Sequence, residues 1–309
     1  MGERVLVSVV MITYGHEKYI RKAIEGVLMQ EGDFDLELVI ANDCSPDNTD
    51  VVVQDVLSHH SNAHWIRYVR HEKNIGMMPN FIFALQQAKG KYVALCEGDD
   101  HWTDPYKLQK QVDFLEAHPD YVLSFHKVKI LKPSGELVDD FITNVPENYE
   151  TQETLAQLGN YIHTPSVVFR NVIKEYPREF SLSPIGDYFL YMLLAEHGKL
   201  KYLEEEMAVY RYAVGIISKM DNFMIACNNV KMYSCMIGAI KSVDVRSILM
   251  MRQETIIEQY GKSFELKDVF IIKLPVTLIY VKERFLELFS NPRKGLNKLK
   301  KKFLKMLKI

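Results

Sequence analysis

The first third of the chain alternates between two spacings of apolar residues. Residues 5–13 form a nearly continuous β-branched and apolar run, which is typical of a strand covered on both faces. Between Tyr19 and Leu28 the apolar residues recur at helical spacing instead. The same patterns predict strands at 5–13, 36–41, 65–69, 92–95 and 121–130, helices at 19–28, 47–58, 77–88 and 105–117, and a turn at 133–135. This order predicts βαβ units and an α/β fold with a mostly parallel central sheet flanked by helices.

Polar and acidic side chains gather where three of these strands end. In such sheets a ligand lies beyond the carboxyl ends of the strands, so we expect these side chains to converge on one site. They are Thr13 and Tyr14 after the first strand, Asn42 and Asp43 after the second, and Glu97, Asp99 and Asp100 after the fourth.

The absence of two glycine-rich motifs argues against two common classes of nucleotide-binding protein. The first strand is not followed by a GxGxxG segment, and the chain has no GxxxxGK[ST] segment. This argues against a dinucleotide-binding dehydrogenase and against a P-loop NTPase. Carboxylates repel a bare diphosphate, so a phosphate ligand here requires a divalent cation, and Mg²⁺ or Mn²⁺ suits oxygen ligands.

Five motifs in the first 110 residues resemble those of family 2 glycosyltransferases, which have the GT-A fold. Their order along the chain also agrees, and a weaker resemblance continues to about Ser218. The motifs are VSVVMITY (7–14) followed by Tyr19-Ile20, VIANDCSPDNT (39–49), Asn74-Ile75-Gly76 with Asn80, EGDDHW (97–102) and PYKL (105–108).

The resemblance implies roles at the nucleotide. Asp43 would accept a hydrogen bond from the base, most often uracil, although its usual Asp neighbour is Asn42 here. Thr13 and Tyr14 would lie against the base and the ribose. Asn74, in the N-x-G segment, belongs to the same nucleotide site.

The acidic D-x-D region would bind the metal and the diphosphate. Asp99 would be the metal ligand, with Mn²⁺ or Mg²⁺ as the cofactor. The first acid of the pattern is Glu97, which is one methylene longer than Asp and is assigned to the nucleotide. Asp100 and Trp102 are candidates on the sugar and acceptor side, with packing beneath the loop as the alternative for Trp102.

Simpler interpretations exist for the same residues. The segment 43–49 has the composition of a turn and a helix cap, and 97–100 that of an exposed acidic loop. His16, His71, His101 and His126 do not have zinc-site spacing, and no metal role is assigned to them.

Sugar transfer with inversion needs a base for the acceptor hydroxyl, and Asp187 is the candidate. Gly186-Asp187 falls where the family has an acidic residue at the start of a helix. The carboxylate alternatively complements the helix N-terminus. Asp139, Asp140 and Glu179 are rival candidates.

Two further segments resemble parts of the family pattern. HTPSVVFR (163–170) resembles the segment lining the acceptor side, so His163 or Thr164 would touch the sugar or the acceptor; an ordinary strand is the alternative. Tyr210-Arg211 with Ser218 resembles a Y-R-x-H segment followed by Ser, which implies a diphosphate contact from Arg211. Ala213 occupies the position of the His.

Charge is distributed unevenly along the 309 residues. Eight Lys or Arg and no acid lie in residues 291–309, and removing these eight from the 38 basic residues leaves 30 against 40 acidic ones, a net charge of −10. A body this acidic is a poor nucleic-acid binder.

The four scattered cysteines indicate reduced thiols in a cytosolic protein, and no signal peptide is expected at the N-terminus.

Residues 219–290 are predicted to be helical. Their methionines are typical of core packing, and the region is a candidate for an acceptor wall or a dimer contact. From Gly295 apolar residues recur every three or four positions with Lys on the other face, a basic amphipathic helix suited to an anionic membrane. Packing on its own domain or on a partner is the alternative. The apolar segment 269–281 is too short and polar for a spanning helix.

These observations predict an inverting, metal-dependent glycosyltransferase that takes a sugar from a nucleotide diphosphate, with UDP favoured. Residues 1–218 would form the GT-A domain and residues 219–309 a helical C-terminal region. We expect a peripheral protein on the inner face of the cell membrane, acting on a glycan or lipid-linked acceptor in polysaccharide assembly. The alternatives are transfer to a polyprenyl phosphate, nucleotidyl transfer (for which the Gly- and Lys-rich loop is missing) and a non-catalytic membrane-bound scaffold.

Overall fold

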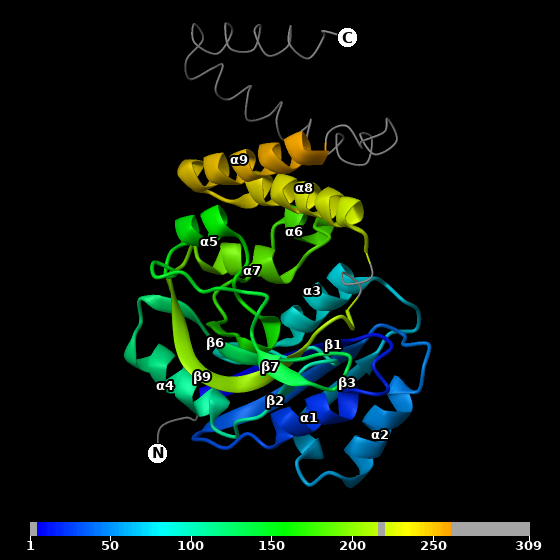
Figure 1. Cartoon of the computed structure of the whole chain (residues 1–309). Coiled ribbons are helices and arrows are strands. Elements are labelled where there is room, and N and C mark those ends of the chain that lie inside the picture. Colours follow the sequence, from blue (N-terminus) through cyan, green and yellow to red (C-terminus); the bar gives the residue numbers. More distant parts are fainter. Residues whose placement is uncertain (1–4, 216–219, 261–309) are drawn as a thin grey trace, which may run out of the picture.

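The computed structural model describes residues 5–215 and 220–260, and within them one sheet lies between two layers of helices (Figure 1). The strands are β1 (Val5–Thr13), β2 (Phe34–Asn42), β3 (Ile66–Arg70), β4 (Tyr92–Leu95), β5 (His101–Trp102), β6 (Tyr121–Leu131), β7 (Leu137–Asp139), β8 (Val168–Arg170) and β9 (Lys199–Arg211). The α-helices are α1 (Ile20–Leu28), α2 (Thr49–His59), α3 (Met77–Gln87), α4 (Lys107–Ala117), α5 (Gln152–Leu158), α6 (Arg178–Leu182), α7 (Asp187–Leu194), α8 (Asn222–Ala239) and α9 (Val243–Tyr260). Two short 3₁₀ turns are η1 (Ala63–Trp65) and η2 (Thr164–Ser166).

The order of strands in the sheet is β3-β2-β1-β4-β8-β6-β9-β5, with β7 beside β6. The first four strands are parallel, as the βαβ pattern predicts. Beyond β4 the sheet becomes mixed, because β8 runs antiparallel to both β4 and β6, while β9 runs parallel to β6. The predicted α/β class is therefore confirmed, and its parallel part is the half that begins the chain.

Strand β1 is buried on both faces, which explains its continuous apolar run. Val7, Val9 and Met11 point into a core beneath α1, α2 and α4. Val10 points the other way, into a second core beneath α3 and α7. Since successive side chains of a strand alternate between faces, one apolar strand serves both layers of helices.

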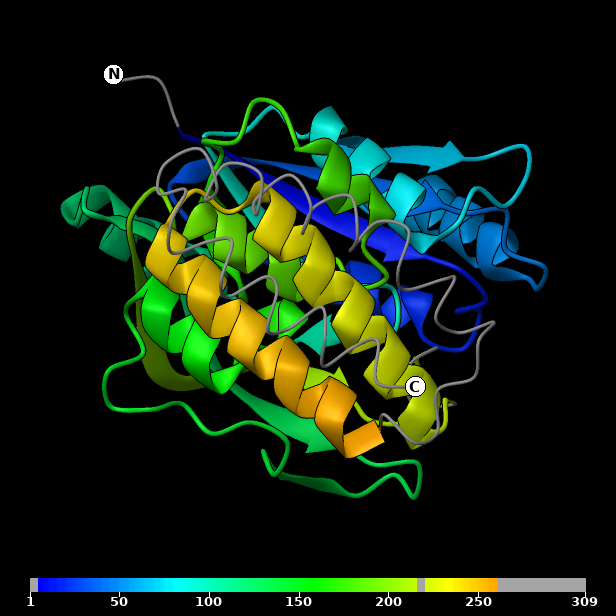
Figure 2. The same ribbon diagram turned by 90° about the horizontal axis from the view of Figure 1, so that it is seen from above.

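Helices α8 and α9 lie side by side over the layer that contains α5, α6 and α7 (Figures 1 and 2). Met232 and Met236 of α8 are buried in the same core as Tyr188 and Leu190 of α7, so these methionines pack the core as predicted. Residues 220–260 are thus helical and continue the core of the sheet domain. Ser218, the apolar segment 269–281 and the basic helix predicted within 291–309 lie outside the described residues.

None of the described helices is both long and apolar enough to cross a membrane.

The predicted element boundaries agree with the structure to within about two residues. The helix predicted from Pro105 begins at Lys107. Asp104 explains the difference, because its Oδ1 accepts a hydrogen bond from Tyr106 N (2.8 Å) and forms a turn before the helix.

Gly26 in α1 should be intolerant of even a methyl group. A Cβ at this position would lie 2.9 Å from both the backbone N and the backbone O of Trp102. Replacing a helical glycine by alanine ordinarily stabilises a helix by about 1 kcal/mol. We predict the opposite sign for Gly26→Ala, a loss of about 1–3 kcal/mol in the free energy of unfolding measured in urea.

Gly238→Ala is the matched control, because Gly238 is exposed near the end of α8. We expect it to raise the free energy of unfolding by about 0.4–1 kcal/mol. Equal stabilisation by both substitutions would contradict the close approach of α1 to Trp102 in β5.

Candidate active site

The loops that follow β2 and β4 lie on either side of the end of β1, and each is bound to β1 by a backbone hydrogen bond. Asp43 N, just after β2, donates to Thr13 O at 3.0 Å. Gly98 N, just after β4, donates to Ile12 O at 3.0 Å. The three predicted strand ends therefore meet at one place, as the sequence indicated.

The segment after β2 anchors the loop after β1. Ser45 Oγ accepts from Gly15 N (3.0 Å), Thr49 Oγ1 accepts from His16 N (2.9 Å), and Asp47 Oδ2 accepts from Glu17 N (3.0 Å). Asp47 Oδ1 also accepts from the backbone N (3.1 Å) and hydroxyl (2.6 Å) of Thr49, the first residue of α2. The turn interpretation therefore holds for residues 45–49, and this turn positions residues 15–17.

Asp43 connects the end of β2 to the N-x-G segment. Its two carboxylate oxygens accept from Ile75 N (2.7 Å) and Gly76 N (2.9 Å), and it is almost fully buried. Gly76 has φ +94°, a conformation that favours glycine. Asn74 is exposed and its Oδ1 accepts from Gly76 N at 3.0 Å. Asp43 therefore positions this segment, and the remaining lone pairs of its oxygens are left for a ligand.

The other two predicted nucleotide residues differ in accessibility. Tyr14 is 42% exposed beyond the end of β1, where a flat ligand can lie against its ring. Thr13 is buried, and its hydroxyl makes no hydrogen bond within the described residues.

Arg211, at the end of β9, binds the acidic loop (residues 97–100) through two hydrogen bonds. Its backbone N donates to Asp100 Oδ1 (2.8 Å), and its Nε donates to Asp99 O (2.8 Å). Its guanidinium also lies 4.4 Å from the centre of the Tyr19 ring. Asp100 is buried and anchors the loop through its hydrogen bond from Arg211 N, and its contact with the sugar or the acceptor stays a prediction.

Mutual repulsion is strong among the carboxylates of this site. Burial, together with the charges of Asp99 and Asp187, raises the pKa of Glu97 above its ordinary range. Burial and the adjacent Asp99 raise the pKa of Asp100. These carboxylates act on Tyr210 as well, whose pKa rises chiefly through burial and then through Asp100 and Glu97.

Asp187, the predicted base, is the first residue of α7. Asn160 Nδ2 donates to its Oδ2 at 3.1 Å. Burial raises the pKa of Asp187 although the Tyr188 backbone N–H and Asn160 oppose that rise. The preceding Gly186 packs against α3, because a Cβ there would lie 2.8 Å from Met78 Sδ. Asp187 is thus a carboxylate close enough to Glu97 to raise its pKa, which brings the predicted base and the D-x-D loop together.

The predicted acceptor wall contains a histidine oriented by an aspartate. His163 Nε2 lies 2.9 Å from Asp140 Oδ2, and its ring lies 4.9 Å from that of Tyr210. Burial opposes ionisation of Asp140, but hydrogen bonds from His163 and Thr143 hold its pKa well below its usual range. Thr164 begins η2 and is nearly buried. Asp140, a rival base from sequence, therefore orients His163, while Asp139 pairs with Lys129 on the exposed β7 and Glu179 lies in α6.

A family model described as glycosyl transferase family 2 matches residues 8–177, more than half of the chain. The chain belongs to glycosyltransferase family 2. Among curated proteins, an uncharacterised protein of Mycobacterium tuberculosis is 37% identical over 212 residues, covering 68% of this chain and 60% of that protein. A putative teichuronic acid biosynthesis glycosyltransferase of Bacillus subtilis is 32% identical over 151 residues, which is 48% of this chain and 57% of the relative. The chain thus spans about 60% of the length of the mycobacterial relative.

Solved glycosyltransferase structures share the GT-A fold of this family member. Residues 1–349 of Staphylococcus aureus TarS in complex with UDP-GlcNAc match with a TM-score of 0.61 at 16% identity, covering 88% of this chain and 80% of that one. A mannosyltransferase from Pyrobaculum calidifontis in complex with GDP-Man and Mn²⁺ matches with a TM-score of 0.57 at 15% identity, covering 90% and 81%. At these identities the likeness concerns the fold alone.

A divalent cation fits the acidic loop of this family 2 glycosyltransferase. Asp99 is 7% exposed, and its Oδ1 is buried with no hydrogen-bond partner in residues 5–215 and 220–260. Those residues contain no group of three or more His, Cys, Asp or Glu arranged to hold a metal. A site with few protein ligands suits Mg²⁺ or Mn²⁺, which commonly bind one or two carboxylates together with substrate phosphates.

Trp102 supports the acidic loop from below. It is 2% exposed, and its Nε1 donates to Pro165 O at 2.8 Å. The structure thus agrees with the packing interpretation of Trp102, and its place on the sugar and acceptor side stays a prediction. The ammonium of the buried Lys107 lies 4.2 Å from the centre of the indole ring and donates to Gln111 Oε1 at 2.8 Å.

Three features of the site do not follow from the sequence. They are the contact of Tyr210 with His163, the hydrogen bond from Asn160 to Asp187, and the pairing of Asp140 with His163. Apart from Asp187, these residues lie on β9 and in the loops around β7 and η2, and only long-range packing brings them together. The Tyr210-Arg211 motif is the one signal that pointed to this wall.

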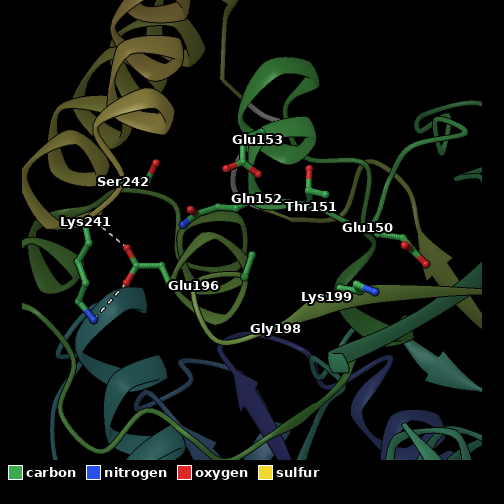
Figure 3. A pocket seen from close by; sticks show the side chains of 10 residues that line it. Glu150, Thr151, Gln152, Glu153, Glu196, Gly198, Lys199, Lys241 and Ser242 are labelled. Carbon is green, nitrogen blue, oxygen red and sulfur yellow. Dashed lines mark hydrogen bonds and ion pairs between the residues drawn. The ribbon is translucent and has the colours of Figure 1, made fainter. Parts of the chain in front are cut away.

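A separate pocket lies near the ends of α5, α7 and α8 (Figure 3). Lys241 and Glu196 form an ion pair at its edge (3.5 Å). None of the predicted site residues lines it, so it is not the candidate active site.

Lys107 provides a pH-dependent test of the support beneath the site. Burial lowers its pKa to about 7, whereas lysine in an unfolded chain has a pKa of about 10.4. Between these two values the unfolded state binds more protons, so the lysine makes stability rise with pH. We predict that Lys107→Met removes this contribution. The stability of the wild type relative to Lys107→Met should therefore rise between pH 7 and pH 9, which urea unfolding of both proteins measures.

A constant difference between the two proteins across that range would contradict the buried, pKa-shifted lysine. Lys110→Met is the matched control, because Lys110 pairs with Asp104 on the exposed side of the same helix.

Proposed function

We propose that the protein is an inverting glycosyltransferase that moves a sugar from a nucleotide diphosphate, with UDP favoured, to an acceptor hydroxyl. The observation that carries the proposal is the meeting of the ends of β1, β2 and β4, which brings together the loops that carry Asp43 and Asp99. Asp187, at the start of α7, acts electrostatically on the second of these loops. These residues bring a nucleotide side, an under-coordinated buried carboxylate and a carboxylate of raised pKa into one site.

The nucleotide side comprises the loops after β1 and β2. Asp43 fixes the segment at Asn74, and Tyr14 presents an exposed ring beside it. An aspartate with unused lone pairs suits the imide N–H of uracil, which supports UDP. TarS in complex with UDP-GlcNAc shares the fold, which agrees with such a donor.

The diphosphate side comprises Asp99, Glu97 and Arg211. Asp99 would hold Mn²⁺ or Mg²⁺, with Arg211 on the opposite wall as the fixed positive charge. When bound, the cation acts as a Lewis acid that stabilises the charge developing on the departing diphosphate. The fold is shared with a mannosyltransferase in complex with Mn²⁺, which agrees with this assignment.

Asp187 would act as the base. The acceptor oxygen attacks the anomeric carbon, the bond to the diphosphate oxygen breaks with its electron pair, and the hydroxyl proton passes to the Asp187 carboxylate. A raised pKa makes this carboxylate a stronger base than an exposed aspartate. His163, oriented by Asp140, would contact the sugar or the acceptor from the facing wall.

The proposal places the reaction in cell-surface polysaccharide or lipid-linked glycan assembly. The similarity to the teichuronic acid glycosyltransferase of B. subtilis supports it. The eight basic residues of 291–309, without an acid, support a peripheral position on the inner face of the cell membrane. A homo-oligomer, with the C-terminal helices as one contact, is compatible with this arrangement.

Nucleotide binding should depend on the metal through Asp99. We predict that UDP binds to the wild type, that Mn²⁺ tightens this binding by about tenfold or more, and that Asp99→Ala abolishes the Mn²⁺ effect. Calorimetry with UDP, GDP, CMP and dTDP, each with and without Mn²⁺, measures all three points.

Asp113→Ala is the control, because Asp113 lies on the exposed side of α4 away from the site. If no nucleotide binds in the presence of metal, the catalytic proposal fails, and the non-catalytic scaffold becomes the interpretation to test.

Activity should follow the ionisation of Asp187. Since its pKa is raised and the base must be deprotonated, kcat/KM is expected to fall on the acid side through a pKa above the usual aspartate value of about 3.9. Asp187→Asn should lower kcat by about 10²–10⁴ at every pH. Initial rates between pH 5 and 9 measure both effects.

Asn160→Ala is the matched variant, because it removes a hydrogen bond that stabilises the charged form of Asp187. It should move the acid limb to higher pH while the rate at high pH is largely kept. Full activity of Asp187→Asn would instead favour a polyprenyl phosphate acceptor, which is already an anion and needs no base.

A further inference from the structure

A histidine of the loop after β1 lies beside the carboxylate of the acidic loop. His16 Nε2 is 3.9 Å from Asp99 Oδ2, and the two side chains are 17% and 9% exposed. This separation exceeds the 2.7–3.2 Å range of a hydrogen bond. The two atoms therefore face each other across a gap that a direct hydrogen bond does not span.

The gap agrees with the dimensions of a metal site. Two atoms that bind one ion at about 2.1 Å each are about 3.0 Å apart when adjacent in an octahedron and about 4.2 Å apart when opposite. The 3.9 Å between His16 Nε2 and Asp99 Oδ2 lies between these two values and closer to the second. The other oxygen of the same carboxylate, Asp99 Oδ1, is buried and lacks a hydrogen-bond partner in the described part of the chain.

The backbone holds His16 firmly in this position. Its N–H donates to Thr49 Oγ1 (2.9 Å), and its carbonyl accepts from Tyr19 N and Ile20 N (2.9 Å each) at the start of α1. On the side of the acidic loop, a Cβ at Gly98 would lie 2.8 Å from His16 Nδ1. The glycine between Glu97 and Asp99 thus leaves the space that the imidazole occupies.

The other neighbours of Asp99 are poorer candidates for a second ligand. The Asp100 carboxylate is buried and accepts from Arg211 N. Arg211 is a cation, and the alanine at position 213 has no ligand atom. Glu97 is the one remaining rival among the acids of this loop.

We propose that His16 Nε2 is a second protein ligand, together with the Asp99 carboxylate, of the divalent cation in this site. The inference rests on the proposed function, which supplies the cation and the diphosphate that completes its coordination. Mg²⁺ prefers oxygen ligands, whereas imidazole is a ligand of transition metals, so the site selects Mn²⁺ over Mg²⁺. This assigns a metal role to a histidine for which the sequence spacing gave none.

Electron spin-echo envelope modulation of Mn²⁺ bound to the full chain with UDP tests the ligand directly. A coordinated imidazole gives ¹⁴N modulation, and growth with ¹⁵N-histidine should replace it by a ¹⁵N pattern in the unsubstituted protein, so this result does not depend on a variant that folds. His16→Gln should abolish the modulation and weaken Mn²⁺ binding by about 10–100-fold, with a smaller effect on Mg²⁺. His163→Gln, on the opposite wall, should retain it.

The outcomes separate this inference from the proposed function. If Mn²⁺ binds with UDP but the wild type lacks nitrogen modulation, or if His16→Gln keeps it, then His16 is not a ligand and the glycosyltransferase proposal stands. Loss of the modulation in His163→Gln alone would move the ligand to the other wall and overturn the inference. If Mn²⁺ does not bind in the presence of UDP, the proposed function itself fails.

Discussion

Repulsion among carboxylates is the constraint around which this site is built. Glu97, Asp99, Asp100 and Asp187 share one largely buried region. Burial and neighbouring acids raise the pKa of Glu97 and Asp100, and burial raises that of Asp187. Burying several like charges is costly unless opposite charges or hydrogen bonds offset them. The protein offsets part of this cost with Arg211, whose backbone N–H binds Asp100 and whose guanidinium binds the carbonyl of Asp99. The unpartnered oxygen of Asp99 is the part that the described residues leave uncompensated, and the proposed cation would compensate it.

The fold around these carboxylates is rigid where it positions them. Two backbone hydrogen bonds fix the loops after β2 and β4 to the last residues of β1, which is buried between two cores. The backbone of Trp102 lies directly against Gly26, and its indole lies over Lys107. A cluster of repelling charges needs such support, because without it the carboxylates could separate into solvent.

The sequence predicted the half of the molecule in which local patterns and neighbouring strands agree. Strands β1 to β4 alternate with helices, so their parallel pairing and the meeting of their ends follow from chain order. The other half follows from pairings far apart in the chain, such as β9 with β6 and β5, which no local period encodes. Tyr210, Asn160 and the Asp140–His163 pair belong to that half. The contacts of Asp100 and Trp102 also depend on this half, because whether a polar side chain faces a ligand or its own loop depends on partners such as Arg211 and Pro165.

The glutamate at position 97 interacts electrostatically with both the proposed metal ligand and the proposed base. An aspartate at this place would hold its carboxylate one methylene closer to the backbone. The longer side chain of Glu97 feels both Asp99, on the metal side, and Asp187, on the side of the base, since the charges of both raise its pKa. Neutralising Asp99 with a cation would therefore favour the ionised form of Glu97. The glutamate that departs from the usual D-x-D pattern is thus a carboxylate whose ionisation depends on the charges of both Asp99 and Asp187.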